Sequence, residues 1–183
     1  MSRIATPATV NDAPEASREL LRGVEKALGS TPNMFRLIGN SAAMLEGYLG
    51  LNSALGKGMI SAATRERIAL TVANTNGCDY CNSAHTFLAK TLAKLDDAEI
   101  AANRAGSSTD AKAHAAVAFA VKVATYRGRV SEDDLAHVKD AGYSDAEVVE
   151  IVGHVALNVL TNYVNEVFET DLDFPFAGAA RAA

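Results

Sequence analysis

Two cysteines and one histidine lie close together in residues 77–85, which read GCDYCNSAH. Cys78 and Cys81 are the only cysteines of the chain. On a helix, residues three apart share a face at a distance of ~5 Å, which a disulfide accepts. His85 lies one turn beyond Cys81, where its ring can reach that sulfur. A thiol pair that can close, with a base beside one member, has the composition of a redox site.

The position of Cys78 bears on which thiol is more acidic. Asn76-Gly77 is expected to end one helix, so Cys78 lies at the start of the next, where unpaired N–H groups and the helix dipole favour an anion. Such a setting lowers a thiol pKa from its usual value of ~8.5. Helix-end electrostatics therefore favour Cys78 as the thiolate, whereas His85 favours Cys81, and the residues alone leave both assignments open.

The helix before the cysteines supplies a fourth candidate, Glu66 in the segment TRERIAL, twelve residues before Cys78. If the two helices pack antiparallel, Glu66 lies close to His85, and a carboxylate there would orient the ring and raise its basicity. A glutamate near a helix start is equally well explained as a surface residue that stabilises the dipole.

The cysteines allow two other interpretations. They could pack as small apolar residues of the core. Together with His85 and Glu66 they could also bind zinc tetrahedrally. Structural zinc sites usually take their ligands from two separated pairs, and the chain has no second cysteine pair. We therefore expect no metal site, although a catalytic zinc held by the two thiolates and the imidazole, with an open water position, stays an alternative.

The elements that position these residues are predicted to be helices. Prolines occur only at positions 7, 14, 32 and 175, and no alternating β-branched run of useful length is present. Capping patterns at Ser131, Ser144 and Asp96 mark helix starts, and glycines such as Gly29 and Gly142 mark ends. We predict an all-α chain with helices at about 14–28, 41–56, 61–75, 79–94, 96–104, 109–127, 132–140 and 145–168, and a helical turn at 33–38.

The apolar positions of the last two helices are predicted to pack on neighbouring helices. These positions are Leu135, Val138, Val148, Val149, Ile151, Val152, Val155 and Val159. In addition, residues 61–73 and 143–156 share a polar cap, an acidic residue and an apolar helix, which suggests a degenerate internal duplication of a helical hairpin.

Length and composition bound the class of protein. A chain of 183 residues with 49% hydrophobic residues is expected to form one domain, 1–183, with residues 177–183 (AGAARAA) as a loose tail. The net charge of −5 argues against nucleic acid as a partner, and no apolar run reaches the ~18 residues of a membrane span. The first residues do not resemble a secretory signal, so we expect a cytoplasmic protein whose thiols are kept reduced.

The segment TRERIALTVANTNGCDYCNSAH resembles the signature of the AhpD-like alkylhydroperoxidase and carboxymuconolactone decarboxylase family, and the spacing of Glu66, Cys78, Cys81 and His85 fits it. The likeness extends over about residues 10–170, where the chain is similar to the peroxidase-related branch. It implies a single-domain AhpD-like helical bundle, a homo-oligomer, and hydroperoxide reduction without metal, cofactor or prosthetic group.

The resemblance also implies roles. Cys81 would be the peroxidatic sulfur that becomes a sulfenic acid, and Cys78 the resolving thiol and proton donor. Glu66 and His85 would form the proton relay. The best-known alkylhydroperoxidases have histidine before the second cysteine, where this chain has Tyr80. A phenol with a pKa of ~10 does not accept a proton near neutrality, which leaves Tyr80 as a candidate hydrogen-bond donor to the peroxide.

Three functional hypotheses follow. The first is a thiol peroxidase that forms a Cys78–Cys81 disulfide, which an external dithiol or protein reductant reduces. The second is a decarboxylase-type lyase with Glu66 and His85 as acid and base. The third is a non-enzymatic thiol redox protein or zinc protein.

Overall fold

The computed structural model describes residues 1–179, and this part of the chain contains helices and no strand. The prediction of an all-α chain is confirmed. The elements are a 3-10 turn η1 (Val10–Asp12) and the helices α1 (Glu15–Leu28), α2 (Asn33–Ile38), α3 (Ala42–Gly56), α4 (Ala62–Thr75), α5 (Asp79–Thr91), α6 (Asp97–Arg104), α7 (Ala111–Thr125), α8 (Glu132–Asp140) and α9 (Asp145–Phe168).

Local signals set the helix bounds. The side chains of Ser131 and Ser144 accept the backbone N–H three residues on, and each forms a capping box with an acidic partner. Gly29 and Gly142, which follow α1 and α8, have φ of 78° and 91°, a left-handed conformation that costs glycine little. The observed helices therefore begin and end within a few residues of the predicted positions.

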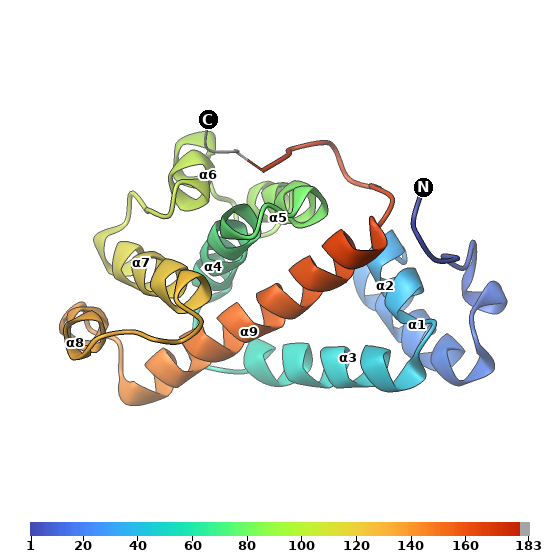
Figure 1. Cartoon of the computed structure of the whole chain (residues 1–183), viewed down its shortest axis with the longest axis horizontal. Helices are drawn as coiled ribbons and strands as arrows, with labels where there is room; N and C mark the ends of the chain where they lie inside the picture. The colour runs from blue at the N-terminus through green and yellow to red at the C-terminus, as the bar shows by residue number, and fades with distance from the viewer. Residues whose placement is uncertain (180–183) are drawn as a thin grey trace.

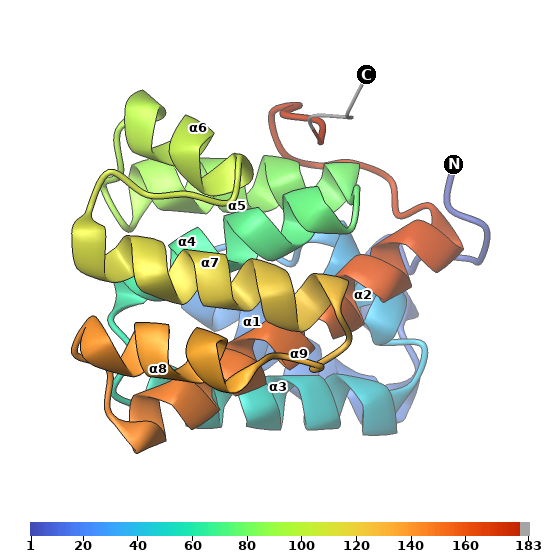
Figure 2. The ribbon, with the colours of Figure 1, turned by 60° about the vertical axis from the view of Figure 1, so that its left-hand side comes forward.

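Helix α4 lies at the centre and packs against α5, α6, α7 and α9 (Figures 1 and 2). The long helix α9 crosses the molecule, with α3 along one side of it and α4 and α5 along the other (Figure 1). One apolar cluster joins α4, α7, α8 and α9 around Ile68, Phe119 and Ile151. A second cluster joins η1, α1, α2 and α3 to the start of α5, and it contains both cysteines.

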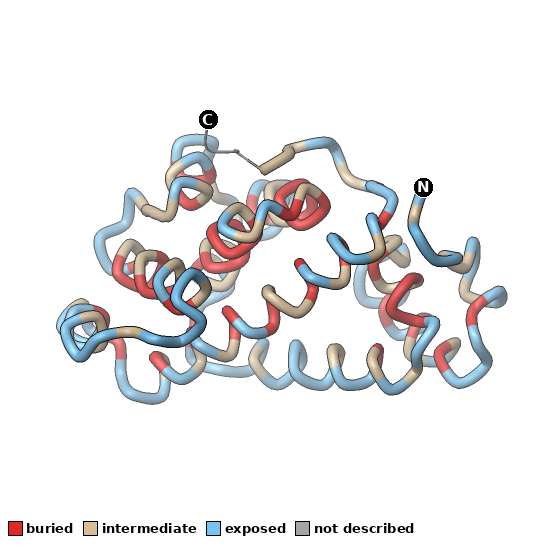
Figure 3. The backbone as a smooth tube through the Cα atoms, viewed as in Figure 1, coloured by how far each residue is buried: buried red, intermediate tan, exposed pale blue. Residues whose placement is uncertain are grey.

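The exposed fractions of the apolar side chains on α8 and α9 confirm most of the predicted packing positions and correct two of them. Val138, Val148, Ile151 and Val155 are buried as predicted, and Leu135 and Val159 pack against the same cluster. Val149 and Val152 were predicted to pack as well, and this is wrong because they are 71% and 43% exposed. They lie on the face of α9 turned away from α4 and α7, since successive helix residues are rotated by ~100°. Figure 3 shows exposed stretches along both α9 and α3.

Two further expectations, the hairpin duplication and the loose tail, differ from what the structure shows. The hairpin duplication paired residues 143–156 and those that follow with α4 and α5, but Asp145–Phe168 is one uninterrupted helix, so no second hairpin is present there. Of the expected loose tail, residues 177–179 are bound to the body: the N–H of Ala177 donates to Ser83 Oγ at 2.9 Å, and the N–H of Ala179 donates to Asp79 Oδ1 at 2.7 Å. Residues 180–183 lie outside the described part.

Among residues 1–179, no helix combines the length and the hydropathy needed to cross a membrane.

Candidate active site

The two cysteines lie at the first turn of α5. After α4, the turn at Asn76 and Gly77, whose φ is 70°, brings Cys78 to the N-cap of α5. The backbone N–H of Cys81 donates to the sulfur of Cys78 at 3.3 Å. Cys78 is 0% exposed and Cys81 is 3% exposed, and both are free thiols. The structure thus brings the two sulfurs together at a buried helix start.

The surroundings of Cys81 favour its thiolate. Burial by itself raises the pKa of this thiol, but a hydrogen bond from the Cys78 thiol, the charge of His85 and the amides of Asn165 and Asn162 lower it to about 7. The amide Nδ2 of Asn165, on α9, lies 3.2 Å from the sulfur and donates to it. Cys81 is therefore partly ionised at neutral pH.

The surroundings of Cys78 have the opposite effect. Its hydrogen bond to the sulfur of Cys81 raises the pKa of Cys78 far above its usual range, and burial acts in the same direction. Helix-end electrostatics alone had favoured Cys78 as the more acidic thiol. The full set of contacts reverses this order, because Cys78 and His85 of the same helix lower the pKa of Cys81 and the amides of Asn165 and Asn162 on α9 lower it further.

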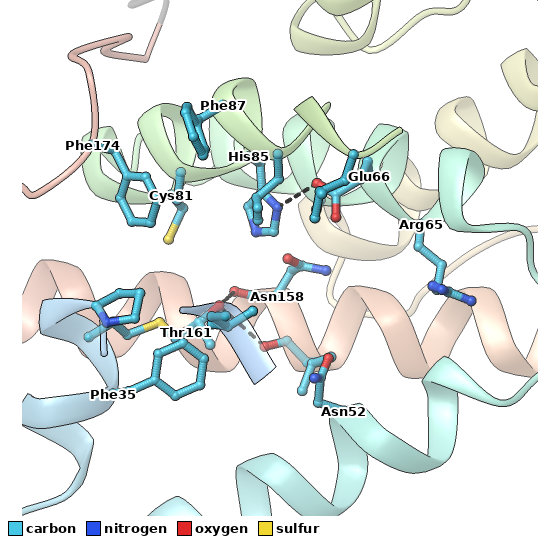
Figure 4. A pocket seen from close by; sticks show the side chains of 18 of the residues that line it. Phe35, Asn52, Arg65, Glu66, Cys81, His85, Phe87, Asn158, Thr161 and Phe174 are labelled. Carbon is cyan, nitrogen blue, oxygen red and sulfur yellow. Dashed lines mark hydrogen bonds and ion pairs between the residues drawn. The ribbon is translucent and has the colours of Figure 1, made fainter. Parts of the chain in front are cut away.

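His85 and Glu66 meet as the antiparallel arrangement of α4 and α5 had suggested. The Nδ1 of His85 lies 2.9 Å from Oε2 of Glu66, and both side chains are largely shielded from solvent (Figure 4). Burial lowers the pKa of His85, but the Glu66 carboxylate and the charge of Cys81 overcome this effect and raise it above the ordinary value. The imidazole therefore stays protonated, beside the Cys81 sulfur, to a higher pH than an ordinary histidine.

Tyr80 is held by the segment that follows α9. Its hydroxyl donates to Asp173 Oδ1 at 2.8 Å and accepts the N–H of Met34 at 3.2 Å. Its ring packs edge-on against Phe174, with centroids 5.8 Å apart. Because both hydrogen bonds point to protein groups, the Tyr80 hydroxyl is not directed at a substrate in this structure, and the expectation that it donates to a peroxide finds no support in its contacts.

A cavity of about 440 Å³ opens beside Cys81 and is bounded by α1, α2, α3, α4, α5 and α9. Cys81, His85 and Glu66 line it, whereas Cys78 does not. Figure 4 shows Cys81 and His85 on one side of this space and Asn158 and Thr161 of α9 on the other. The remaining labelled walls are the rings of Phe35, Phe87 and Phe174 and the polar side chains of Asn52 and Arg65. The cavity thus offers Cys81, and not Cys78, to a bound molecule.

Sequence reasoning missed the polar side chains that α9 and α3 bring to this site. Asn158, Thr161, Asn162 and Asn165 are all buried on α9. Their spacing of i, i+3, i+4 and i+7 places them on one face, and this polar stripe was the available signal. Tyr48 of α3 also lines the cavity, and nothing in its local sequence marks it.

The zinc hypothesis needs Glu66, Cys78, Cys81 and His85 as one ligand set. In residues 1–179, no three histidine, cysteine, aspartate or glutamate side chains are grouped so that they could hold a metal ion.

Comparison with known proteins shows which family model the segment around the site matches. Residues 42–126, which contain the Glu66 and Cys78–His85 segments, match the model of the carboxymuconolactone decarboxylase family. No curated protein matches the chain.

Several solved structures share the fold. A peroxidase-related protein from Ralstonia eutropha JMP134, described as an alkylhydroperoxidase AhpD core, has a TM-score of 0.83 at 23% identity, over 94% of this chain and 92% of that one. A peroxidase-related protein from Silicibacter sp. TM1040 has a TM-score of 0.80 at 20% identity, over 93% and 91%.

The debrominase Bmp8 is also similar, with a TM-score of 0.77 at 22% identity, over 93% of this chain and 92% of that one. A cysteine-to-alanine variant of Bmp8 in complex with 2,3,4-tribromopyrrole has a TM-score of 0.79 at 22% identity, over 94% of each chain. The matched segment contains the candidate site residues, and the shared architecture shows that this chain has the fold of these solved structures.

Proposed function

We propose that the chain is a thiol-dependent alkyl hydroperoxide reductase that uses Cys78 and Cys81 as its redox pair. The observation that carries the proposal is that the two thiols differ in their access to the cavity and in their pKa. Cys81 lines the cavity and has a pKa of about 7, whereas Cys78 lies behind it, fully buried, with a raised pKa. An ionised nucleophile facing the cavity, with a protonated thiol in contact behind it, suits two-step peroxide reduction.

In the first step the Cys81 thiolate attacks the terminal oxygen of the hydroperoxide. The S–O bond forms, the O–O bond breaks, and sulfur is oxidised to a sulfenic acid while the alkoxide leaves with the bonding electrons and takes up a proton. The His85–Glu66 pair keeps a positive charge beside the sulfur before the attack. Its role is to hold the thiolate and supply protons.

In the second step Cys78 condenses with the sulfenic acid. The S–S bond forms, and the hydroxyl of the sulfenic acid leaves as water with the proton that Cys78 has retained. An external dithiol or protein reductant then reduces the disulfide by thiol–disulfide exchange and is itself oxidised. Because both cysteines are at most 3% exposed, reduction requires the first turn of α5 to become accessible.

Consumption of cumene hydroperoxide with a dithiol donor tests the proposal. Cys81→Ser should abolish turnover, and Cys78→Ser should allow one stoichiometric oxidation to the sulfenic acid without a disulfide. Mass spectrometry of the wild-type protein after one equivalent of peroxide should show loss of two hydrogens in the peptide that contains both cysteines. Wild-type turnover by Cys81→Ser would disprove the assignment.

A second candidate is reductive dehalogenation of a small aromatic ring, favoured by the likeness to the Bmp8 structures and by the aromatic walls of the cavity. The Cys81 thiolate would attack the halogen and the ring carbon would take a proton. Cys78 would then displace halide from sulfur to form the disulfide. Halide release from 2,3,4-tribromopyrrole with a dithiol, compared directly with peroxide consumption, separates the two activities.

A lyase of the decarboxylase type is the remaining candidate, favoured by the family match over residues 42–126. It would use Glu66 and His85 as acid and base and leave the thiols without a role. Activity on a lactone acid that survives in the Cys78→Ser/Cys81→Ser double variant would support it.

A further inference from the structure

The oxygen that leaves during peroxide cleavage needs an acid, and of the groups named so far only the His85–Glu66 pair can supply a proton on the cavity side. The thiol of Cys78 does not line the cavity, and the Tyr80 hydroxyl is bound to Asp173 and Met34. The charge of His85 is directed to Glu66 and Cys81. An alkoxide is a strong base, so its departure is slow without a proton donor.

Tyr48 is the side chain placed to act as this donor. It lies on α3 and lines the same cavity as Cys81, His85 and Glu66. Its ring packs edge-on against Phe35 with centroids 5.7 Å apart, which fixes the orientation of the phenol. Within residues 1–179 its hydroxyl has no hydrogen-bond partner. A partly buried phenol that lines a cavity with an unused donor is available to a ligand there.

Burial and nearby charges keep the Tyr48 hydroxyl protonated. Burial raises the pKa of Tyr48 above its ordinary value, and the negative charges of Cys81 and Glu66 raise it further. The phenol is therefore a neutral donor that does not compete with Cys81 for ionisation.

We propose that Tyr48 is a further catalytic residue whose hydroxyl protonates the alkoxide that leaves when Cys81 attacks the hydroperoxide; this inference rests on the proposed function. As the O–O bond breaks, the proton of the Tyr48 hydroxyl passes to the leaving oxygen and an alcohol is released. The tyrosinate regains a proton from the His85 imidazolium or from water. Sulfur has then gained one oxygen, and no further oxidant or reductant enters the step.

The experiment compares two peroxides of similar size that differ in leaving group. Cumene hydroperoxide releases an alkoxide, which needs a proton, and perbenzoic acid releases benzoate, which does not. Single-turnover oxidation of Cys81 is followed in the wild-type protein, in Tyr48→Phe and in Tyr163→Phe, a matched control at an exposed tyrosine of α9. Alkylation by iodoacetamide reports the thiolate without any peroxide.

Tyr48→Phe should slow oxidation by cumene hydroperoxide by about 10²-fold, the usual contribution of one general acid, and should leave oxidation by perbenzoic acid and alkylation near the wild-type rates. Tyr163→Phe should change none of the three. Equal slowing of all three reactions, or no slowing with cumene hydroperoxide, would overturn the role of Tyr48. If neither peroxide oxidises the wild-type protein although iodoacetamide reacts with it, the proposed function itself fails.

Discussion

The side-chain amide of Asn165 donates a hydrogen bond to the sulfur of Cys81 across 3.2 Å, between residues 84 positions apart in the chain. Both residues are buried, so water does not replace this bond when it is lost. A donor fixed beside the sulfur stabilises the thiolate more than the thiol, which is one cause of the lowered pKa of Cys81.

Asn165→Leu is therefore expected to raise the pKa of Cys81. One hydrogen bond to a charged acceptor contributes about 1.5–3 kcal/mol, which corresponds to a rise of about one to two pKa units. The ultraviolet absorbance of the thiolate as a function of pH measures this shift. Asn158→Leu is the matched control, because that amide donates to the backbone oxygen of His154 and not to sulfur. An unchanged titration in Asn165→Leu would contradict the interpretation.

Cys81 should react with an alkylating reagent in preference to Cys78, and the rate should follow the ionisation of Cys81 with pH. Because its pKa is about 7, alkylation by iodoacetamide should be slow below this pH, where the thiol is protonated, and should rise through it as the thiolate forms. Cys81→Ser should lose this reaction, and Cys78→Ser should keep it. Peptide mapping of the alkylated protein identifies the site, and preferential labelling of Cys78 would refute the assignment.

The ion pair between His85 and Glu66 should control the charge beside Cys81. In Glu66→Gln the carboxylate that raises the pKa of His85 is absent, so the imidazole should lose its proton at a lower pH and the pKa of Cys81 should rise. At pH 7 we expect alkylation to slow by about three- to tenfold, the change in thiolate fraction for a shift near one unit. Nuclear magnetic resonance of the His85 ring measures its titration directly. Glu46→Gln, at an exposed carboxylate of α3, should change neither.

Glu99 anchors the loop between α6 and α7 and should contribute strongly to stability. Its carboxylate is 4% exposed and accepts hydrogen bonds from Arg67, Asn103, Ser108 and Thr109. Burial alone would raise its pKa, but these donors lower it well below the usual range. Glu99→Ala should destabilise the protein by about 3–5 kcal/mol at pH 7, as expected when a buried ion pair loses one partner.

The pH dependence of this contribution has a definite sign. Because the folded pKa of Glu99 is depressed, its stabilisation is fully present above the unfolded pKa of ~4.3 and is lost as pH falls through the folded pKa. Urea unfolding at pH 7 and pH 3 should therefore show a smaller difference between Glu99→Ala and wild type in acid. Glu19→Ala, at an exposed i,i+3 pair with Arg22, should cost less than about 1 kcal/mol.

The helices were predictable because their starts and ends are local. Caps such as Ser131 and Ser144 satisfy backbone groups within the same turn, and glycines such as Gly29 adopt the left-handed conformation that ends a helix. Whether one face of a helix is covered depends on distant segments of the chain, as Val149 and Val152 show. Their apolar character fits a core, but no helix of the described chain covers their side of α9.

The sequence by itself determined that Cys78, Cys81 and His85 share the first turns of one helix, and that Glu66 lies on the helix before it. His85 and Cys78 on that helix lower the pKa of Cys81 most, but only the tertiary structure decided the balance between the two sulfurs, because a thiol pKa also depends on burial and on donors from distant segments. Asn165 from α9, Tyr48 from α3 and the cavity between them come from segments distant in the chain. Helix-end electrostatics favoured Cys78, and these contacts favour Cys81, since several donors and a nearby imidazolium outweigh one helix dipole.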